Sequence, residues 1–300
     1  MTSAIGAEVL KANSVGDVAK NAHLANINAL LIFTSQDGLN TGLYHFREVG
    51  VDMEVYNLPF KFHFDSQSNV NYFMVGNVGY SRVYVSKDII IPPSSRLNYN
   101  NHLRTYTAGL GGGMRYKFTQ ELNVLGGLEL IYSRSGASVK QPDDDLGNAI
   151  EDFFNKNYND NISYKIFAQV EYKPKFKHLN PYIKFDYKFF DTKSDFTFDE
   201  LGTFQSQSDV SSLSIGAESN ELFRYDNSYL TLEAYLNANY LNGAVVESVK
   251  FNKYAKVGGV AYWYIENTPS FIKRYFIEVS SINADSLDGY NLGIGFSLNY

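Results

Sequence analysis

The sequence predicts an all-β fold, a transmembrane antiparallel β-barrel of about 12 strands preceded by a short N-terminal helix. Apolar and polar residues alternate strictly in one segment after another, as in strands with two different faces. These segments exceed the roughly five or six residues of soluble strands and reach the roughly nine to eleven needed to cross hydrocarbon. The chain also holds 24 Tyr and 22 Phe, and aromatic residues gather at both interfaces of membrane barrels.

The N-terminal segment, residues 1–28, is predicted to be helical, and the barrel is expected over residues 29–300. Ser14 is a suitable N-cap with Asp17 three positions later, and small apolar residues follow at helical spacing. The helix over residues 14–28 is too short and too polar to cross a membrane. We expect it in the barrel lumen or just below the barrel, and its small side chains favour the lumen.

Eleven strands are clear when the chain is read back from its C-terminus to Val51. Bacterial single-chain barrels have even strand numbers, so one further strand should precede them. Its candidates are residues 28–34 and residues 41–48. The clearest alternation runs through residues 103–118, 122–134, 162–173, 181–191, 228–241, 253–265 and 290–300.

Each long strand has one apolar face, which we assign to lipid, and one polar face, which we assign to an enclosed interior. A soluble sandwich strand alternates as well, but many long strands with open edges invite aggregation, whereas closure in lipid removes the edges. Tyrosines are expected on the outer face near opposite ends of their strands: Tyr72 and Tyr80, Tyr106 and Tyr116, Tyr164 and Tyr172.

The connections alternate between short and long, as periplasmic turns and external loops do in outer-membrane barrels. The short ones contain residues 66–69, 120–121, 178–180, 225–227 and 267–270. The long ones are expected near residues 88–101, 139–159, 195–208, 243–250 and 283–288.

Composition excludes several other classes of protein. The chain has no Cys, which removes disulfides, thiolate nucleophiles and thiolate metal sites. A net charge of −6 without a basic patch argues against a nucleic-acid partner. The first four residues lack the basic and apolar regions of a secretory signal, so we expect that the signal has been removed and that the chain resides in the bacterial outer membrane.

Charged side chains of both signs are predicted on the inner face, and two interpretations of them stay open. They form either a water-filled, weakly selective pore with cations and anions on opposing walls, or a lumen filled by salt-bridge networks. The expected pore-lining residues are Arg115, Lys117, Glu129, Lys165, Glu171, Lys184, Asp186, Lys188, Glu218, Glu233, Lys256 and Glu278. Lys61, His63 and Lys173 share this face. Inner-face glycines either ease strand curvature or make room for the helix: Gly109, Gly111, Gly113, Gly127, Gly216, Gly258, Gly293 and Gly295.

Catalysis is not expected. A lipid-modifying barrel enzyme needs Ser and His within hydrogen-bond reach on the outer wall. Among the five histidines only His102 has acidic loop candidates nearby, Asp88 or residues 143–145. Three adjacent Asp side chains do not converge on one ion, so neither a metal site nor a cofactor is predicted.

The layout resembles the outer-membrane autotransporter β-domain, in particular the solitary barrels that lack a passenger. The residues that carry the resemblance are Asn57–Phe62, Val75–Tyr80, Gly109–Gly113 and Gly293–Tyr300. The resemblance implies a helix leading into about 12 strands and recognition of the C-terminal strand by the barrel-assembly machinery. Tyr300 stands where the family usually has Phe.

The function expected from these features is a passive channel for small hydrophilic solutes, embedded in outer-membrane lipid. The alternative is a plugged, non-conducting barrel that presents its loops for adhesion or partner binding. A lipid-modifying enzyme is the third interpretation. The oligomeric state is left open.

Overall fold

The structure is a computed structural model, and it describes residues 40–46, 51–64, 68–91, 95–140, 158–196, 203–266 and 272–298. Within these ranges, no helix has both the length and the apolar character needed to cross a membrane. The strands are β1 (Asn40–Phe46), β2 (Val51–Phe64), β3 (Val70–Ile91), β4 (Ser95–Lys117), β5 (Leu122–Lys140), β6 (Tyr158–Tyr172), β7 (Leu179–Phe196), β8 (Thr203–Ser219), β9 (Phe223–Tyr225), β10 (Ser228–Gly243), β11 (Lys253–Ile265), β12 (Ile272–Ala284) and β13 (Leu287–Leu298). One helix, α3 (Ala244–Val249), joins β10 to β11.

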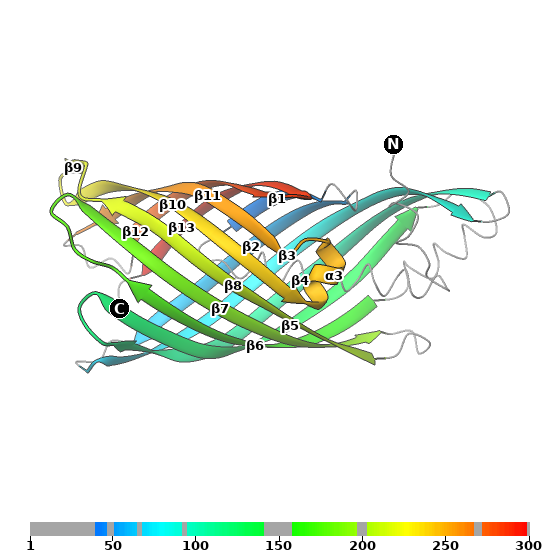
Figure 1. Ribbon diagram of the computed structural model, residues 1–300, viewed down its shortest axis with the longest axis horizontal. Coiled ribbons are helices and arrows are strands. Elements are labelled where there is room, and N and C mark those ends of the chain that lie inside the picture. Colours follow the sequence, from blue (N-terminus) through cyan, green and yellow to red (C-terminus); the bar gives the residue numbers. More distant parts are fainter. Residues whose placement is uncertain are drawn as a thin grey trace.

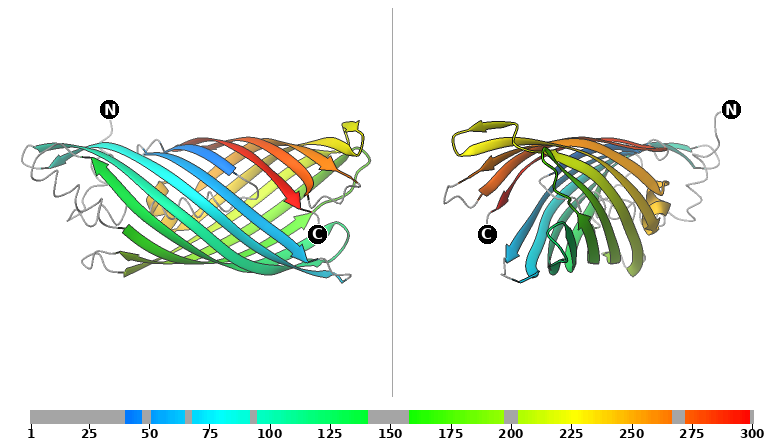
Figure 2. Two further views of the ribbon diagram at one scale, coloured as in Figure 1. Left: turned by 180° about the vertical axis from the view of Figure 1, so that it is seen from behind. Right: turned by 60° about the vertical axis from the view of Figure 1, so that its left-hand side comes forward.

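Twelve of these strands close into an antiparallel barrel. Each long strand pairs with the next along the chain, and β1 pairs with both β2 and β13, which joins the two ends of the barrel. The three-residue strand β9 pairs only with the start of β10 and belongs to the connection after β8. Figures 1 and 2 show the strands running obliquely around the wall, with β9 at one end and α3 at the other.

The twelfth strand occupies the second of the two predicted positions. β1 begins at Asn40 and overlaps the candidate at residues 41–48, whereas the candidate at residues 28–34 lies outside the described residues. The predicted helix over residues 14–28 and the boundary between residues 28 and 29 also lie outside them.

Two predicted loops are wrong because strands or a tight turn replace them. Residues 88–101 were expected as a loop, but β3 and β4 pair throughout, from Ser86 with Asn100 to Ile91 with Ser95. The alternation simply continues there, and pairing across one hairpin satisfies the backbone groups of both strands. Residues 283–288 form the ends of β12 and β13 with a two-residue turn between them.

The apolar faces of the strands point outward and are not covered by a second layer. Leu128 and Leu130 in β5 are 62% and 50% exposed, and Ile166 in β6 is 49% exposed. The tyrosines predicted at opposite ends of the outer face are also outward, with Tyr106 and Tyr164 strongly exposed. Because such a band is unfavourable in water, this arrangement is that of a barrel whose outer wall faces lipid.

Candidate functional site in the barrel lumen

The predicted lumen residues all occupy the inner-face positions of the alternation. In β6, for example, Lys165 is buried between the exposed Tyr164 and Ile166. We call the half of the barrel next to the short connections the proximal half, and the half next to the long connections the distal half. Eleven of the charged residues lie between the proximal ends and the middle of their strands: Arg115, Lys117, Glu129, Lys165, Glu171, Lys184, Asp186, Lys188, Glu218, Glu233 and Glu278. Lys256 lies nearer the distal end, three residues after β11 begins.

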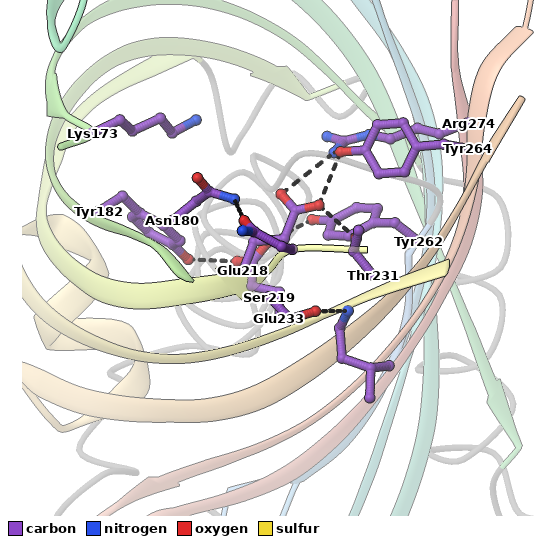
Figure 3. A network of polar contacts seen from close by, with 12 residues as sticks. Lys173, Asn180, Tyr182, Glu218, Ser219, Thr231, Glu233, Tyr262, Tyr264 and Arg274 are labelled. Atoms are coloured by element: carbon purple, nitrogen blue, oxygen red, sulfur yellow. Dashed lines mark hydrogen bonds and ion pairs between the residues drawn. The ribbon is translucent and has the colours of Figure 1, made fainter. Parts of the chain in front are cut away.

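Glu233 in β10 is the centre of a first polar cluster on the wall formed by β8 to β12, and the cluster extends to Tyr182 of β7. Its carboxylate accepts hydrogen bonds from the hydroxyls of Tyr182, at 2.6 Å, and Tyr262, at 2.8 Å. The Lys173 ammonium lies 5.8 Å from the ring centre of Tyr182. Figure 3 shows these side chains converging on the barrel interior from separate strands. The cluster therefore ties together three strands, β7, β10 and β11.

A second carboxylate, Glu218 in β8, lies beside the first. It accepts hydrogen bonds from Thr231 at 2.5 Å and from the Tyr264 hydroxyl at 2.9 Å. Arg274 donates to the same Tyr264 hydroxyl at 2.6 Å, lies 4.0 Å from Glu218, and stacks over the Tyr262 ring. Figure 3 shows this chain of contacts running from β8 to β12. Two acidic side chains are thus held by neutral tyrosine donors, with one arginine nearby.

Glu278 in β12 completes the acidic wall. Lys256 donates to it at 2.7 Å, and the Tyr235 hydroxyl donates to the same oxygen. The three glutamates face two cations on this wall, Arg274 and Lys256. Three carboxylates against two cations leave this wall weakly acidic.

The wall formed by β3 to β7 contains a more deeply buried ion pair. Lys165 Nζ donates to Glu129 Oε2 at 2.8 Å, and the two side chains are only 10% and 3% exposed. Asn77 donates to the other oxygen of Glu129. The same wall carries Arg115 in β4 and Lys184 and Lys188 in β7, with Lys184 Nζ 3.5 Å from the Asp186 carboxylate. The sequence predicted these residues but not which of them pair.

The distal half is lined on one side by small polar residues. Thr107, Asn159, Asn161 and Ser194 are buried, and each has at least one polar atom without a hydrogen-bond partner in the described part of the chain. Buried polar groups require partners, and water or a hydrophilic solute supplies them when protein groups do not. These atoms are therefore open to partners other than the described side chains.

The other side of the distal half contains an apolar cluster, which the sequence did not predict. Helix α3 folds toward the lumen, and its Val245 and Val249 are buried. Phe251, just after the helix, stacks on Phe46 of β1 with ring centres 6.2 Å apart. Residues 243–250 were expected only as a loop, because a six-residue helix is too short to produce a recognisable periodicity. The connection narrows the distal mouth from one side.

The inner-face glycines are matched by aromatic rings on neighbouring strands. Gly216 lies opposite Tyr182 in the register, and Gly258 lies opposite Tyr235. A Cβ added at Gly216 would come within 2.6 Å of the Tyr182 ring. Gly295 and Phe276 repeat the arrangement between β12 and β13. These rings already occupy the space beside the glycines, which leaves less of it for a packed helix than the sequence suggested.

We therefore expect Gly216→Val to lower the free energy of unfolding by about 1–3 kcal/mol, because overpacking forces the Tyr182 ring aside. Urea unfolding in phospholipid vesicles measures this loss. Tyr182→Ala combined with Gly216→Val removes the clash, so the double variant should lose less than the sum of its two single variants. Simple addition of the two losses would contradict the ring-over-glycine contact.

The histidines do not assemble a catalytic group in the described residues. His102 packs edge-on against Tyr84, with ring centres 4.8 Å apart, while Asp88 pairs with Asn98 farther along the hairpin. Residues 143–145 lie outside the described ranges. One histidine contact that the sequence did not predict joins His45 Nδ1 to Asp52 at 2.6 Å, exposed on the outer face.

Comparison with known proteins gives similarity at the level of fold. No protein-family model and no curated relative matches the chain. Among solved structures, the translocator domain of the autotransporter NalP from Neisseria meningitidis matches with a TM-score of 0.62 at 10% identity, over 96% of this chain and 100% of that one. The transport unit of AIDA-I from Escherichia coli gives 0.57 at 10% identity, over 94% and 99%. The β-domain of Bordetella BrkA gives 0.55 at 8% identity, over 86% and 96%. The chain thus has the 12-stranded fold of the autotransporter translocator barrels, as its sequence pattern predicted.

Proposed function

We propose that this protein is a passive channel for small hydrophilic solutes in the bacterial outer membrane. The observation that carries the proposal is the unequal chemistry of the two faces. The outer face is apolar from strand to strand, whereas the inner face carries charged and small polar side chains. A polar interior in a membrane barrel is the lining of an aqueous path.

The charge arrangement supports weak selectivity. Glu218, Glu233 and Glu278 lie on one wall, and Arg115, Lys184 and Lys188 lie on strands of the other. The described hydrogen bonds and ion pairs of the glutamates join strands that are at most three positions apart in the barrel. Such contacts run along the wall rather than across the lumen, and this supports the proposed channel.

Planar-bilayer recordings on the full chain test the proposal, which predicts discrete conductance steps. Glu233→Gln removes a negative charge and should lower the cation-to-anion permeability ratio by roughly a factor of two to ten, and Lys188→Gln should raise it by a similar factor. Lys193→Gln is the matched control, because Lys193 lies on the outer face of the same strand as Lys188. Equal changes in the permeability ratio for Lys188→Gln and Lys193→Gln would show that the lumen charges do not set the selectivity.

The second candidate is a plugged barrel that presents its loops, and the apolar contact between Phe46 and Phe251 favours it. Deleting residues 1–28 leaves all 12 barrel strands in the chain, because β1 begins at Asn40. Conductance that is absent in the full chain and arises on this deletion supports the plug. Conductance absent from both forms would refute the channel. Either role includes assembly through the C-terminal strand by the barrel-assembly machinery.

A further inference from the structure

Three arginines lie together on the outer face of β3, β4 and β5. Arg82 and Arg104 are directly opposite each other, and Arg134 is opposite Tyr106. Tyr80 and Tyr106, one outward position closer to the proximal half, form the tyrosine girdle with ring centres 5.1 Å apart. From Val70 to Arg82 the strand rises roughly 28 Å along the membrane normal at a tilt of about 45°. The arginines therefore lie just beyond a hydrocarbon band of about 25 Å, at the distal interface.

The facing pair of arginines is unfavourable by itself. Like charges directly opposite on neighbouring strands repel each other. Glu54 faces Arg82 from β2, yet no ion pair within 4.0 Å joins them in the described structure. Arg82 stacks on the Tyr84 ring at 4.7 Å, and its Nε is buried without a hydrogen-bond partner among the described residues. An anion between the two guanidinium groups would relieve this repulsion.

The structure provides a space for such an anion. Gly136 of β5 lies directly opposite Arg104, and a Cβ built on Gly136 meets nothing within 4 Å. On its other side Gly136 pairs with Tyr158 of β6. Arg104 and Tyr158 thus flank an open position, with Arg82 one strand farther on. We call Arg82, Arg104, Gly136 and Tyr158 the arginine niche.

The neighbouring arginine, Arg134, already has an acidic partner, so it does not compete for a ligand of the niche. Arg134 donates two hydrogen bonds to Asp160, at 2.7 and 2.9 Å, and stacks over Tyr158. The Tyr132 hydroxyl donates to the same carboxylate. This bidentate contact holds the Tyr158 side of the niche in place. Arg104 and Arg82 remain without an ion pair in the described structure, with Glu54 opposite Arg82.

We propose that the arginine niche binds the phosphate headgroup of an anionic lipid in the distal leaflet. Guanidinium groups match phosphate oxygens in a planar, two-point geometry. Six residues closer to the proximal half, beyond Tyr106 and Arg134, the outer face of β4 and β5 carries exposed Leu110 and Leu130, along which acyl chains can lie. This apolar wall is the reason for assigning a lipid phosphate rather than free phosphate. The proposal depends on the barrel crossing a membrane and is independent of whether its lumen conducts.

Native mass spectrometry of the full chain in neutral detergent tests the proposal, with phosphatidic acid as the probe. Diacylglycerol with the same acyl chains is the control ligand, since it lacks only the phosphate. We expect phosphatidic acid to bind in preference to diacylglycerol. Arg104→Gln and Arg82→Gln should each weaken its binding roughly tenfold, the value of a hydrogen bond to a charged group. Lys193→Gln, on the outer face of β7, should leave binding unchanged.

Gly136→Leu tests the shape of the niche without altering any charge, and it should also weaken phosphatidic acid binding. Far-UV circular dichroism checks that each variant is folded, and Arg104→Lys serves as a charge-preserving variant with intermediate binding. Equal binding of phosphatidic acid and diacylglycerol would overturn the proposal, as would unchanged binding in Arg104→Gln and Gly136→Leu. Full displacement of phosphatidic acid by equimolar inorganic phosphate would also overturn it, in favour of a free-anion site.

Discussion

Lys165→Met is expected to lower the free energy of unfolding by about 3–5 kcal/mol, among the largest losses that a single side chain of this barrel can cause. Lys165 is the only cation within ion-pairing distance of Glu129 in the described structure, with Nζ 2.8 Å from Oε2. Glu129 is 3% exposed, so its charge would remain buried with Asn77 as its described donor. Leaving a buried charge without a partner lowers the free energy of unfolding by far more than the intact ion pair contributes to it.

A double variant distinguishes the cost of losing the ion pair from the cost of leaving the Glu129 charge buried without a partner. Glu129→Leu with Lys165→Met replaces both charges by apolar groups, which is often nearly neutral for a buried ion pair. We therefore expect the double variant to recover most of the loss. Urea unfolding in phospholipid vesicles provides the measurement, and the fluorescence of Trp263, the only Trp of the chain, follows the transition. A double variant as unstable as Lys165→Met would show that the loss comes from removing Lys165 itself and not from an isolated charge on Glu129.

The two faces of the barrel could be predicted from the sequence because strand alternation has a period of two and is visible residue by residue. The assignment of Glu129 and Lys165 to one face needed only their positions in the pattern. The strand count followed from the same period together with the requirement for an even number. The first strand needed the structure, because β1 has seven residues and shows too little alternation to choose between two candidates.

The pairing of lumen residues could not be predicted because it depends on barrel closure and stagger. Tyr182 and Glu233 are 51 residues apart and come from strands that are second neighbours. Their contact depends on the register of β7, β8 and β10, and no local pattern encodes that register. The fold of residues 244–251 into the distal mouth is another such feature, since Phe251 meets Phe46 only after β1 has closed the barrel.

Leu128→Arg is the prediction that tests the membrane assignment most directly, with an expected loss of about 2–4 kcal/mol in the free energy of unfolding from a bilayer. Leu128 is 62% exposed on the outer face of β5 and pairs with Gly112 and Ile166 on the neighbouring strands. It lies in the middle of the apolar band, so an arginine there must enter hydrocarbon or distort the bilayer around it. Reversible urea unfolding in phosphatidylcholine vesicles measures the loss.

Leu222→Arg is the matched control, because Leu222 is similarly exposed, at 57%, but belongs to the short connection between β8 and β9. Outside the hydrocarbon, this substitution should change stability by no more than about 0.5 kcal/mol. In a soluble protein both leucines would be ordinary exposed surface positions, and the two substitutions would have similarly small effects. A large loss at Leu128 with little change at Leu222 therefore requires that the outer face of β5 be solvated by acyl chains, while equal effects would refute a membrane-spanning barrel.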